Sequence, residues 1–178
     1  LAGLMGRDCA GGATVGALVG AAFGWSSYSE KVASGQSVNA QARREGVMVP
    51  DDQIALKEYR VRPSAAVARA GGEPLQVIGD IKLIGQSRYG ADVVQSMTLI
   101  KANGEKASDT PQIAKVHNVD GAGQYRAVGV YKIPRGMEQG QYTVQSVLFL
   151  NGREVARRDT SFQVAGNERQ SPQAYARN

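Results

Sequence analysis

Few residues in this chain have the types and the spacing that side-chain chemistry requires. Its 178 residues include one cysteine, Cys9, and one histidine, His117. A cysteine-based zinc cage and an internal disulfide both need more cysteines. His117 has no acidic residue at a useful spacing in its predicted strand, so a structural or exposed histidine is a better interpretation than a base or a metal ligand.

The other polar candidates also lack the partners that catalysis needs. Asp51 and Asp52 could share a metal ion with Asp80, but adjacent aspartates before a strand more often cap or solvate a turn. Ser87 and Ser96 have no histidine in a triad-like context. We therefore predict no catalytic residue, no metal and no cofactor, and we expect a protein that is not an enzyme.

The composition is typical of a folded chain with a buried core. Hydrophobic residues make up 42% and charged residues 21%, and the mean hydropathy is -0.30. These values exclude wholesale disorder and a multi-pass membrane protein. The net charge of +5 is spread along the chain, so no segment has the form of a nucleic-acid arm and we predict no nucleic-acid partner.

A stripe of small residues lies near the beginning of the chain. Every residue from Ala10 to Trp25 is apolar, glycine or threonine. Glycine recurs at every fourth position, at Gly12, Gly16, Gly20 and Gly24. On a helix these positions drift by about 40° per step and form one face. Such glycines cost a water-exposed helix roughly 4 kcal/mol relative to alanine, whereas in a bilayer the helix is the default and small residues let two helices approach closely.

The flanks of this stripe agree with a membrane helix. Trp25 and Tyr28 lie where an aromatic interface belt is expected. About 16 residues span roughly 24 Å, which suits the thinner bacterial outer membrane. We interpret the segment as a membrane or interface helix that packs against copies of itself or against other helices. A buried helix in a soluble assembly fits the same spacing, and a signal peptide or a glycine-rich loop fits it less well.

With alanines and valines between the four glycines, residues 9–25 resemble the glycine-zipper segment of bacterial envelope proteins, many of which are outer-membrane lipoproteins. The resemblance implies the bacterial cell envelope, at the outer membrane, with a periplasmic or surface-exposed domain. It also implies partners: copies of this chain or other envelope-assembly subunits, and membrane lipid. Cys9 is then a candidate for lipidation, although it follows Gly6-Arg7-Asp8 instead of a small apolar tripeptide. The alternative is a small buried thiol.

Beyond residue 51, short β-prone runs replace the helical spacing and turn residues separate them. Two hairpin turns are predicted, at Asn103-Gly104 and at Asn151-Gly152. The predicted strands are Lys57–Arg62, Leu75–Ile84, Val93–Lys101, Ile113–His117, Gln124–Ile133, Gln141–Leu150 and Glu154–Val164. Seven strands is the number found in an immunoglobulin-like sandwich. The stretch from Ile133 to Val164 resembles the last three strands of many bacterial immunoglobulin-like domains.

Alternation within these strands predicts the core and its irregularities. One predicted face carries Leu75, Val77, Ile81 and Leu83, and another carries Tyr142, Val144 and Leu148. Tyr142 is either a tyrosine corner, with its hydroxyl bonded to the preceding turn, or a plain core aromatic. A change of parity in the last strand predicts a bulge near Arg157-Arg158. That arginine pair contacts acidic lipid or a partner, or belongs to a solvated face.

The sequence thus predicts a mainly β protein: a seven-stranded immunoglobulin-like sandwich preceded by one glycine-rich hydrophobic α-helix. Residues 1–50 form the helix and a polar linker, residues 51–165 the sandwich, and residues 166–178 a polar tail. We expect a structural, non-enzymatic subunit of a bacterial cell-envelope assembly, whose helix self-associates through the glycine stripe while the sandwich makes protein contacts. The alternatives are a membrane-anchored binding module for polysaccharide or a secretion-machine component, and an extracellular filament subunit.

Overall fold

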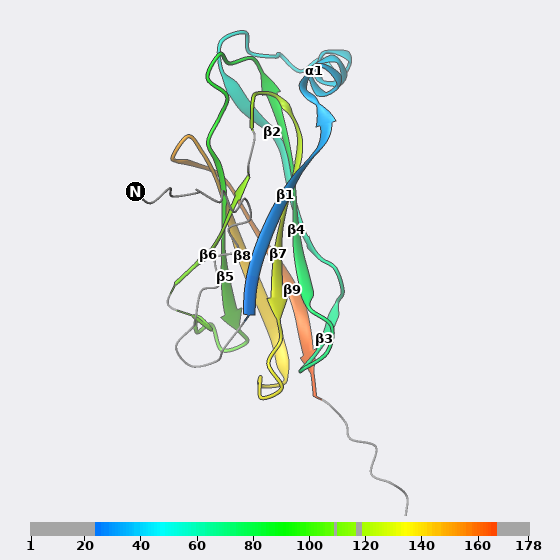
Figure 1. Cartoon of the computed structure of the whole chain (residues 1–178), viewed down its shortest axis with the longest axis vertical. Coiled ribbons are helices and arrows are strands. Elements are labelled where there is room, and N and C mark those ends of the chain that lie inside the picture. The colour runs from blue at the N-terminus through cyan, green and yellow to red at the C-terminus, as the bar shows by residue number, and fades with distance from the viewer. Residues whose placement is uncertain (1–23, 109, 117–118, 167–178) are drawn as a thin grey trace, which may run out of the picture.

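The computed structural model describes residues 24–108, 110–116 and 119–166, which form a mainly β fold with two sheets and one short helix (Figure 1). In chain order the elements are β1 (Gly24–Ser34), α1 (Gly35–Arg44), β2 (Ile54–Pro63), β3 (Val67–Arg69), β4 (Leu75–Gly85), β5 (Val93–Lys101), β6 (Gln112–Val116), β7 (Gly123–Lys132), β8 (Gly140–Leu150) and β9 (Arg153–Ala165).

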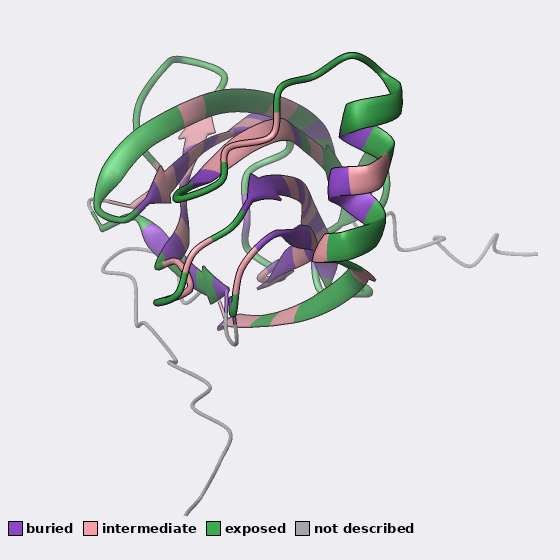
Figure 2. Ribbon diagram, turned by 90° about the horizontal axis from the view of Figure 1, so that it is seen from above, coloured by how far each residue is buried: buried purple, intermediate pink, exposed green. Residues whose placement is uncertain are grey.

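The two sheets pack face to face as a β-sandwich. The four-stranded sheet has the order β1-β7-β4-β2, and the five-stranded sheet has the order β3-β9-β8-β5-β6. Neighbouring strands are antiparallel except β3 and β9, which are parallel. Val77 and Tyr131 of the first sheet share a hydrophobic cluster with Val144 and Phe162 of the second. Buried residues therefore face the space between the sheets (Figure 2).

All seven segments that the sequence predicts as strands form strands, with a difference of at most three residues at any end. The predicted core faces are confirmed, because every side chain assigned to them is at most 4% exposed. The structure differs in the number of strands: β1 and β3 were not predicted, which gives nine among the described residues.

The predicted hairpin and bulge of the last two strands are both present. Asn151 and Gly152 have φ values of +50° and +77°, the left-handed conformation that a tight hairpin turn requires. The bulge lies at Val155, because Leu148 pairs with Ala156 while the next residue, Phe149, pairs with Glu154. This position is two residues before the predicted one, and it sets which side of β9 each later side chain occupies.

The beginning of the sandwich differs from the predicted boundary at residue 51. Strand β1 pairs with β7 from Gly24 to Ser34 and forms an edge of the four-stranded sheet. Trp25 is only 4% exposed, and its ring centroid lies 4.6 Å from that of Tyr131. Gly129 leaves room for the indole, since a Cβ there would collide with it. Trp25 thus lies in the core and not at the predicted membrane interface, because the gap over Gly129 buries its large apolar surface.

Helix α1 docks on one end of the sandwich, at the top of Figure 1. The Ser34 hydroxyl caps it by accepting from the Ser37 amide at 3.2 Å. Asn39 donates to the carbonyl of Gly85 at 2.9 Å and accepts from the amide of Gly85 at 3.0 Å. Val38 and Ala42 are buried beside Ile84. Part of the predicted linker is therefore a helix fixed to β4.

Several predicted sites lie outside the described residues, namely Cys9, Gly12, Gly16, Gly20 and His117. The prediction that Gly24 belongs to a helix face is wrong, because Gly24 is the first residue of β1, where a Cβ would approach the Lys132 side chain to 2.8 Å. Tyr28 also lies on β1 and is 49% exposed. In the part of the chain that the structure describes, no helix has the length and apolar character needed to span a bilayer.

Candidate binding groove between two strand edges

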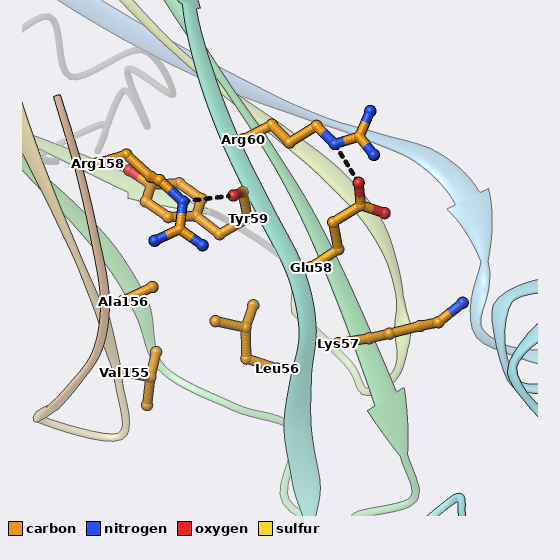
Figure 3. A pocket seen from close by; sticks show the side chains of 8 residues that line it. All are labelled: Leu56, Lys57, Glu58, Tyr59, Arg60, Val155, Ala156 and Arg158. Carbon is orange, nitrogen blue, oxygen red and sulfur yellow. Dashed lines mark hydrogen bonds and ion pairs between the residues drawn. The ribbon is translucent and has the colours of Figure 1, made fainter. Parts of the chain in front are cut away.

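A groove opens on one side of the sandwich, between β2 and β9 (Figure 3). β2 is an edge of its sheet, and β3 covers only the end of β9, at Gln163–Ala165. On that side, none of the described strands pairs with β9 between Arg153 and Asp159. The cavity has a volume of about 500 Å³, within the range of small-ligand sites. Its lining residues are Leu56, Lys57, Glu58, Tyr59, Arg60, Val155, Ala156 and Arg158.

Irregular pairing in both strands coincides with this opening. The register of β2 shifts between Leu56 and Glu58, and Val155 is the extra residue of β9. A bulge bends its strand and increases the local twist, so the two edges diverge below Tyr59 in Figure 3. Leu56 and Ala156 are half-buried and pack against the hydrophobic core. The floor of the groove is therefore apolar.

Arg158 gives the groove a positive charge. Its Nε donates to the carbonyl oxygen of Tyr59 at 3.2 Å, and its Nη1 donates to the carbonyl oxygen of Arg157 at 2.7 Å. Both acceptors are uncharged, and no carboxylate among the described residues forms an ion pair with Arg158. Its side chain is exposed. Arg158 is thus a positioned guanidinium available to an anion.

The other charged groups of the lining have acidic or basic partners. Glu58 forms ion pairs with Arg60 and, at 3.1 Å, with Lys82. Lys57 pairs with Glu45, and this hydrogen bond lowers the pKa of the Glu45 carboxyl. Within the described part of the lining, Arg158 is therefore the one charged side chain without a partner of opposite charge.

Behind the groove lies a polar layer inside the core. Tyr59 is 2% exposed, and Ser146 and Gln95 are fully buried. The hydroxyl of Tyr59 faces that of Ser146, whereas the side-chain amide of Gln95 has no hydrogen-bond partner among the described residues, which is uncommon for a buried group. Burial raises the pKa of Tyr59 above its usual range, so its hydroxyl stays protonated. Ser146 pairs with Arg158 in the register of β8 and β9.

The structure separates the acidic residues that the sequence suggested for a shared metal. Asp51 and Asp52 line a cavity of about 520 Å³ with Arg88 and the 97% exposed Tyr89. Asp80 lies on β4, where it accepts a hydrogen bond from Arg126 at 2.9 Å. The described residues contain no group of three His, Cys, Asp or Glu side chains with the spacing of a metal site.

The two serines considered for catalysis also lie apart. Ser87 accepts from the amide of Tyr89 at 3.3 Å in the loop after β4, whereas Ser96 lies on β5 opposite Val147.

Two tyrosines form corners. The Tyr142 hydroxyl donates to the carbonyl oxygen of Glu138 at 2.9 Å, which confirms the predicted tyrosine corner. The Tyr125 hydroxyl makes the same contact with Gly121, also at 2.9 Å. This second corner was not predicted, although Tyr125 follows the turn residues 120–123 by two positions and thus stands in the position of a corner tyrosine.

No protein-family model matches this chain, and no curated protein sequence matches it. Among solved structures, an alkylpurine DNA glycosylase from Pseudomonas fluorescens bound to DNA is 14% identical, with a TM-score of 0.37 over 74% of this chain and 36% of that chain. A family 123 glycoside hydrolase from Clostridium perfringens is 14% identical, with a TM-score of 0.40, and the match covers 81% of this chain and 27% of the hydrolase. An immunoglobulin-like protein from Pseudomonas aeruginosa is 16% identical, with a TM-score of 0.37, and the match covers 67% of this chain and 98% of that protein.

The chain spans about a third of the length of the glycosylase and about a quarter of the length of the hydrolase. Similarity at this level assigns neither an activity nor a ligand to the chain. Two of the matches are nevertheless enzymes, and this finding contradicts the prediction that the chain is not an enzyme.

Proposed function

We propose that this chain is a structural subunit of a bacterial cell-envelope assembly. The glycine stripe, which comprises Gly12, Gly16 and Gly20 because Gly24 begins β1, packs against like segments at a membrane, while the sandwich contacts protein partners. The observation that carries the proposal is the unbroken four-residue spacing of glycines, which suits close backbone packing. The stripe leads directly into β1, where Trp25 is held in the core.

The order of the strands supports an immunoglobulin-like sandwich in this role. Neighbouring strands lie in the order β2-β4-β7 in one sheet and β9-β8-β5 in the other, as in the two sheets of such domains. Strand β1 takes the edge position beside β7. Sandwiches of this type present their edges and loops to partners. In the proposed assembly the sandwich lies in the periplasm or at the cell surface, next to the outer membrane. The partners are copies of this chain or other envelope subunits, together with membrane lipid.

Substitutions in the glycine stripe test this function. We expect Gly16→Leu with Gly20→Leu to lower the oligomer mass of the full chain in detergent, because leucine side chains keep two helix backbones apart. Light scattering after size-exclusion chromatography measures that mass. Val15→Leu with Val19→Leu is the matched control, since it enlarges the bulky side of the same segment. An oligomer that survives the glycine substitutions contradicts the proposal.

The groove between β2 and β9 favours a second function, a binding module whose N-terminal segment serves only as an anchor. A chain that begins at Gly24 retains β1 and Trp25 but lacks the stripe. A folded monomer that still binds the partner of the full chain supports the module, and loss of all binding supports the assembly subunit. Cell fractionation separates both from the third alternative, an extracellular filament.

A further inference from the structure

We propose that the groove between β2 and β9 binds an extended peptide through a carboxylate side chain, which Arg158 holds. This inference rests on the second function above, the binding module, and names the class of its ligand. Three features of the groove lead to it: a guanidinium with free donors, two unpaired strand edges, and an apolar floor.

The guanidinium of Arg158 determines the charge of the ligand. A guanidinium has five N–H donors, and the two backbone carbonyls occupy one on Nε and one on Nη1. Both N–H groups of Nη2 and the second N–H of Nη1 stay available, and this end of the fork matches the two oxygens of a carboxylate. The carbonyl contacts also fix the orientation of the Arg158 side chain, so that this side chain loses less conformational entropy when a ligand binds. Figure 3 shows the guanidinium directed into the space between Leu56 and Ala156.

The strand edges determine the backbone of the ligand. β2 has one strand neighbour, β4, and the first half of β9 has one strand neighbour, β8, among the described strands. Each edge therefore presents main-chain N–H and C=O groups to the groove. An extended peptide satisfies such groups by adding as a strand, with alternate side chains directed inward. A lipid headgroup or a compact anion has no matching row of donors and acceptors.

The floor determines the side chain beside the carboxylate. Leu56 and Ala156 are half-buried, and Val155 is 40% exposed at the opening. An apolar side chain placed against them is removed from water, which stabilises the complex. Since Tyr59 is 2% exposed, its ring offers little surface for stacking on a sugar. A peptide that alternates apolar and hydroxyl residues around one glutamate meets all three requirements.

Fluorescence polarisation of a labelled octapeptide, TVTETVTV, with the full chain tests the inference. We expect saturable binding that weakens at least tenfold when glutamine or lysine replaces the peptide glutamate. Arg158→Gln should weaken binding at least tenfold as well. Arg157→Gln is the matched control: it removes the same charge one residue away, from a side chain paired with Glu154 at 3.2 Å on the opposite face of β9. Its Kd should stay within twofold of the wild-type value.

A second variant covers the case in which loss of the Arg158 contacts alters the fold. Ala156→Glu places a carboxylate inside the groove, next to Arg158, and should block the peptide at an unchanged melting temperature. Amide shifts in NMR spectra should then locate the wild-type complex at Leu56 and Ala156. Equal weakening by the Arg157 and Arg158 variants, or amide shifts elsewhere, would overturn the inference.

An acidic oligosaccharide, trigalacturonate, separates the inference from the function on which it rests. If the oligosaccharide shifts the groove amides and the peptide does not, the peptide inference is wrong while the binding module stands. If neither probe shifts these amides, both are wrong.

Discussion

The β1–β6 side of the sandwich and its β2–β9 side are built differently. On the first side, β1 contacts β6 across the gap between the sheets, and Trp25 reaches into the core beside Tyr131. Lys31 on this side forms an ion pair of 2.7 Å with Asp120. On the second side, β2 also contacts β9, and the exposed Arg158 donates a hydrogen bond from β9 to the carbonyl oxygen of Tyr59 on β2.

This difference shows what closes a sandwich. An aromatic anchor over a glycine removes a large apolar area from water and fills the gap between the sheets. An arginine that bonds a backbone carbonyl spans the gap but leaves the volume below it open. The first side therefore contributes mainly to stability, and the second keeps a site at which a ligand can complete the contacts.

The largest expected effect on stability comes from truncating one apolar side chain on each side of the sandwich. We expect Trp25→Ala to lower the free energy of unfolding by about 3–5 kcal/mol, the usual cost of deleting a buried aromatic side chain. Leu56→Ala, the control on the open side, should cost about 1 kcal/mol because Leu56 is only half-buried and its site can fill with water. Urea unfolding followed by circular dichroism measures both. Similar losses would show that the two sides are equally closed.

The predictable part of the fold is the part with local signals. Alternating apolar residues located β4 and β8, and Asn151-Gly152 located the hairpin before β9. Strand β1 was missed because only Trp25 among its residues is buried, so it lacks the alternation that marks a strand. In the sequence, Trp25 and Tyr28 follow a glycine-rich run, and this pattern favoured a membrane interface. The partner of Trp25 is the gap over Gly129, about a hundred residues away in the chain.

The groove was not predictable, because its two walls come from opposite ends of the sandwich sequence. The pair Arg157-Arg158 was recognised, and its assignment to a solvated face or to a partner was left open. The position of the bulge sets which of the two arginines faces the groove. With the extra residue at Val155, Arg157 faces outward to Glu154 and Arg158 lies over Tyr59. The sequence around the bulge gave its position with an error of two residues, because no local signal marks Val155 as the extra residue.

The polar layer behind the open side leads to a stabilising substitution. Gln95 is fully buried, and neither the oxygen nor the nitrogen of its side-chain amide has a hydrogen-bond partner among the described residues. We expect Gln95→Met to raise the free energy of unfolding by about 1 kcal/mol, because methionine fills a similar volume without the desolvation cost of an unpaired amide. Gln145→Met is the control, since the side-chain oxygen of Gln145 accepts a hydrogen bond from Arg157 at 3.3 Å. Chemical unfolding of both variants measures the difference, and a loss of stability in Gln95→Met would mean that the amide is paired.

The smallest expected effect concerns the ion pair on the closed side. The hydrogen bond from Lys31 lowers the pKa of the Asp120 carboxyl, and the bond to Asp120 raises the pKa of the Lys31 ammonium. A lowered carboxyl pKa gives stability that is present above the unfolded value, about 3.9, and is lost as the pH falls through the folded value. A raised ammonium pKa gives stability that is present below about 10.4 and is lost as the pH rises through the folded value.

Asp120→Asn should therefore lower the melting temperature slightly between about pH 4 and pH 10, and this difference should vanish in more acidic solution. High salt should reduce it, because both side chains are exposed and the attraction between them is screened. In a Lys31→Met background the same substitution should have a smaller effect, since the charged partner is absent and the hydrogen bond from the Tyr125 hydroxyl, at 3.3 Å, remains. Thermal unfolding at several pH values measures the difference. If Asp120→Asn lowers the melting temperature equally at pH 3 and pH 7, the ion pair does not help to close the side of the sandwich that Trp25 fills.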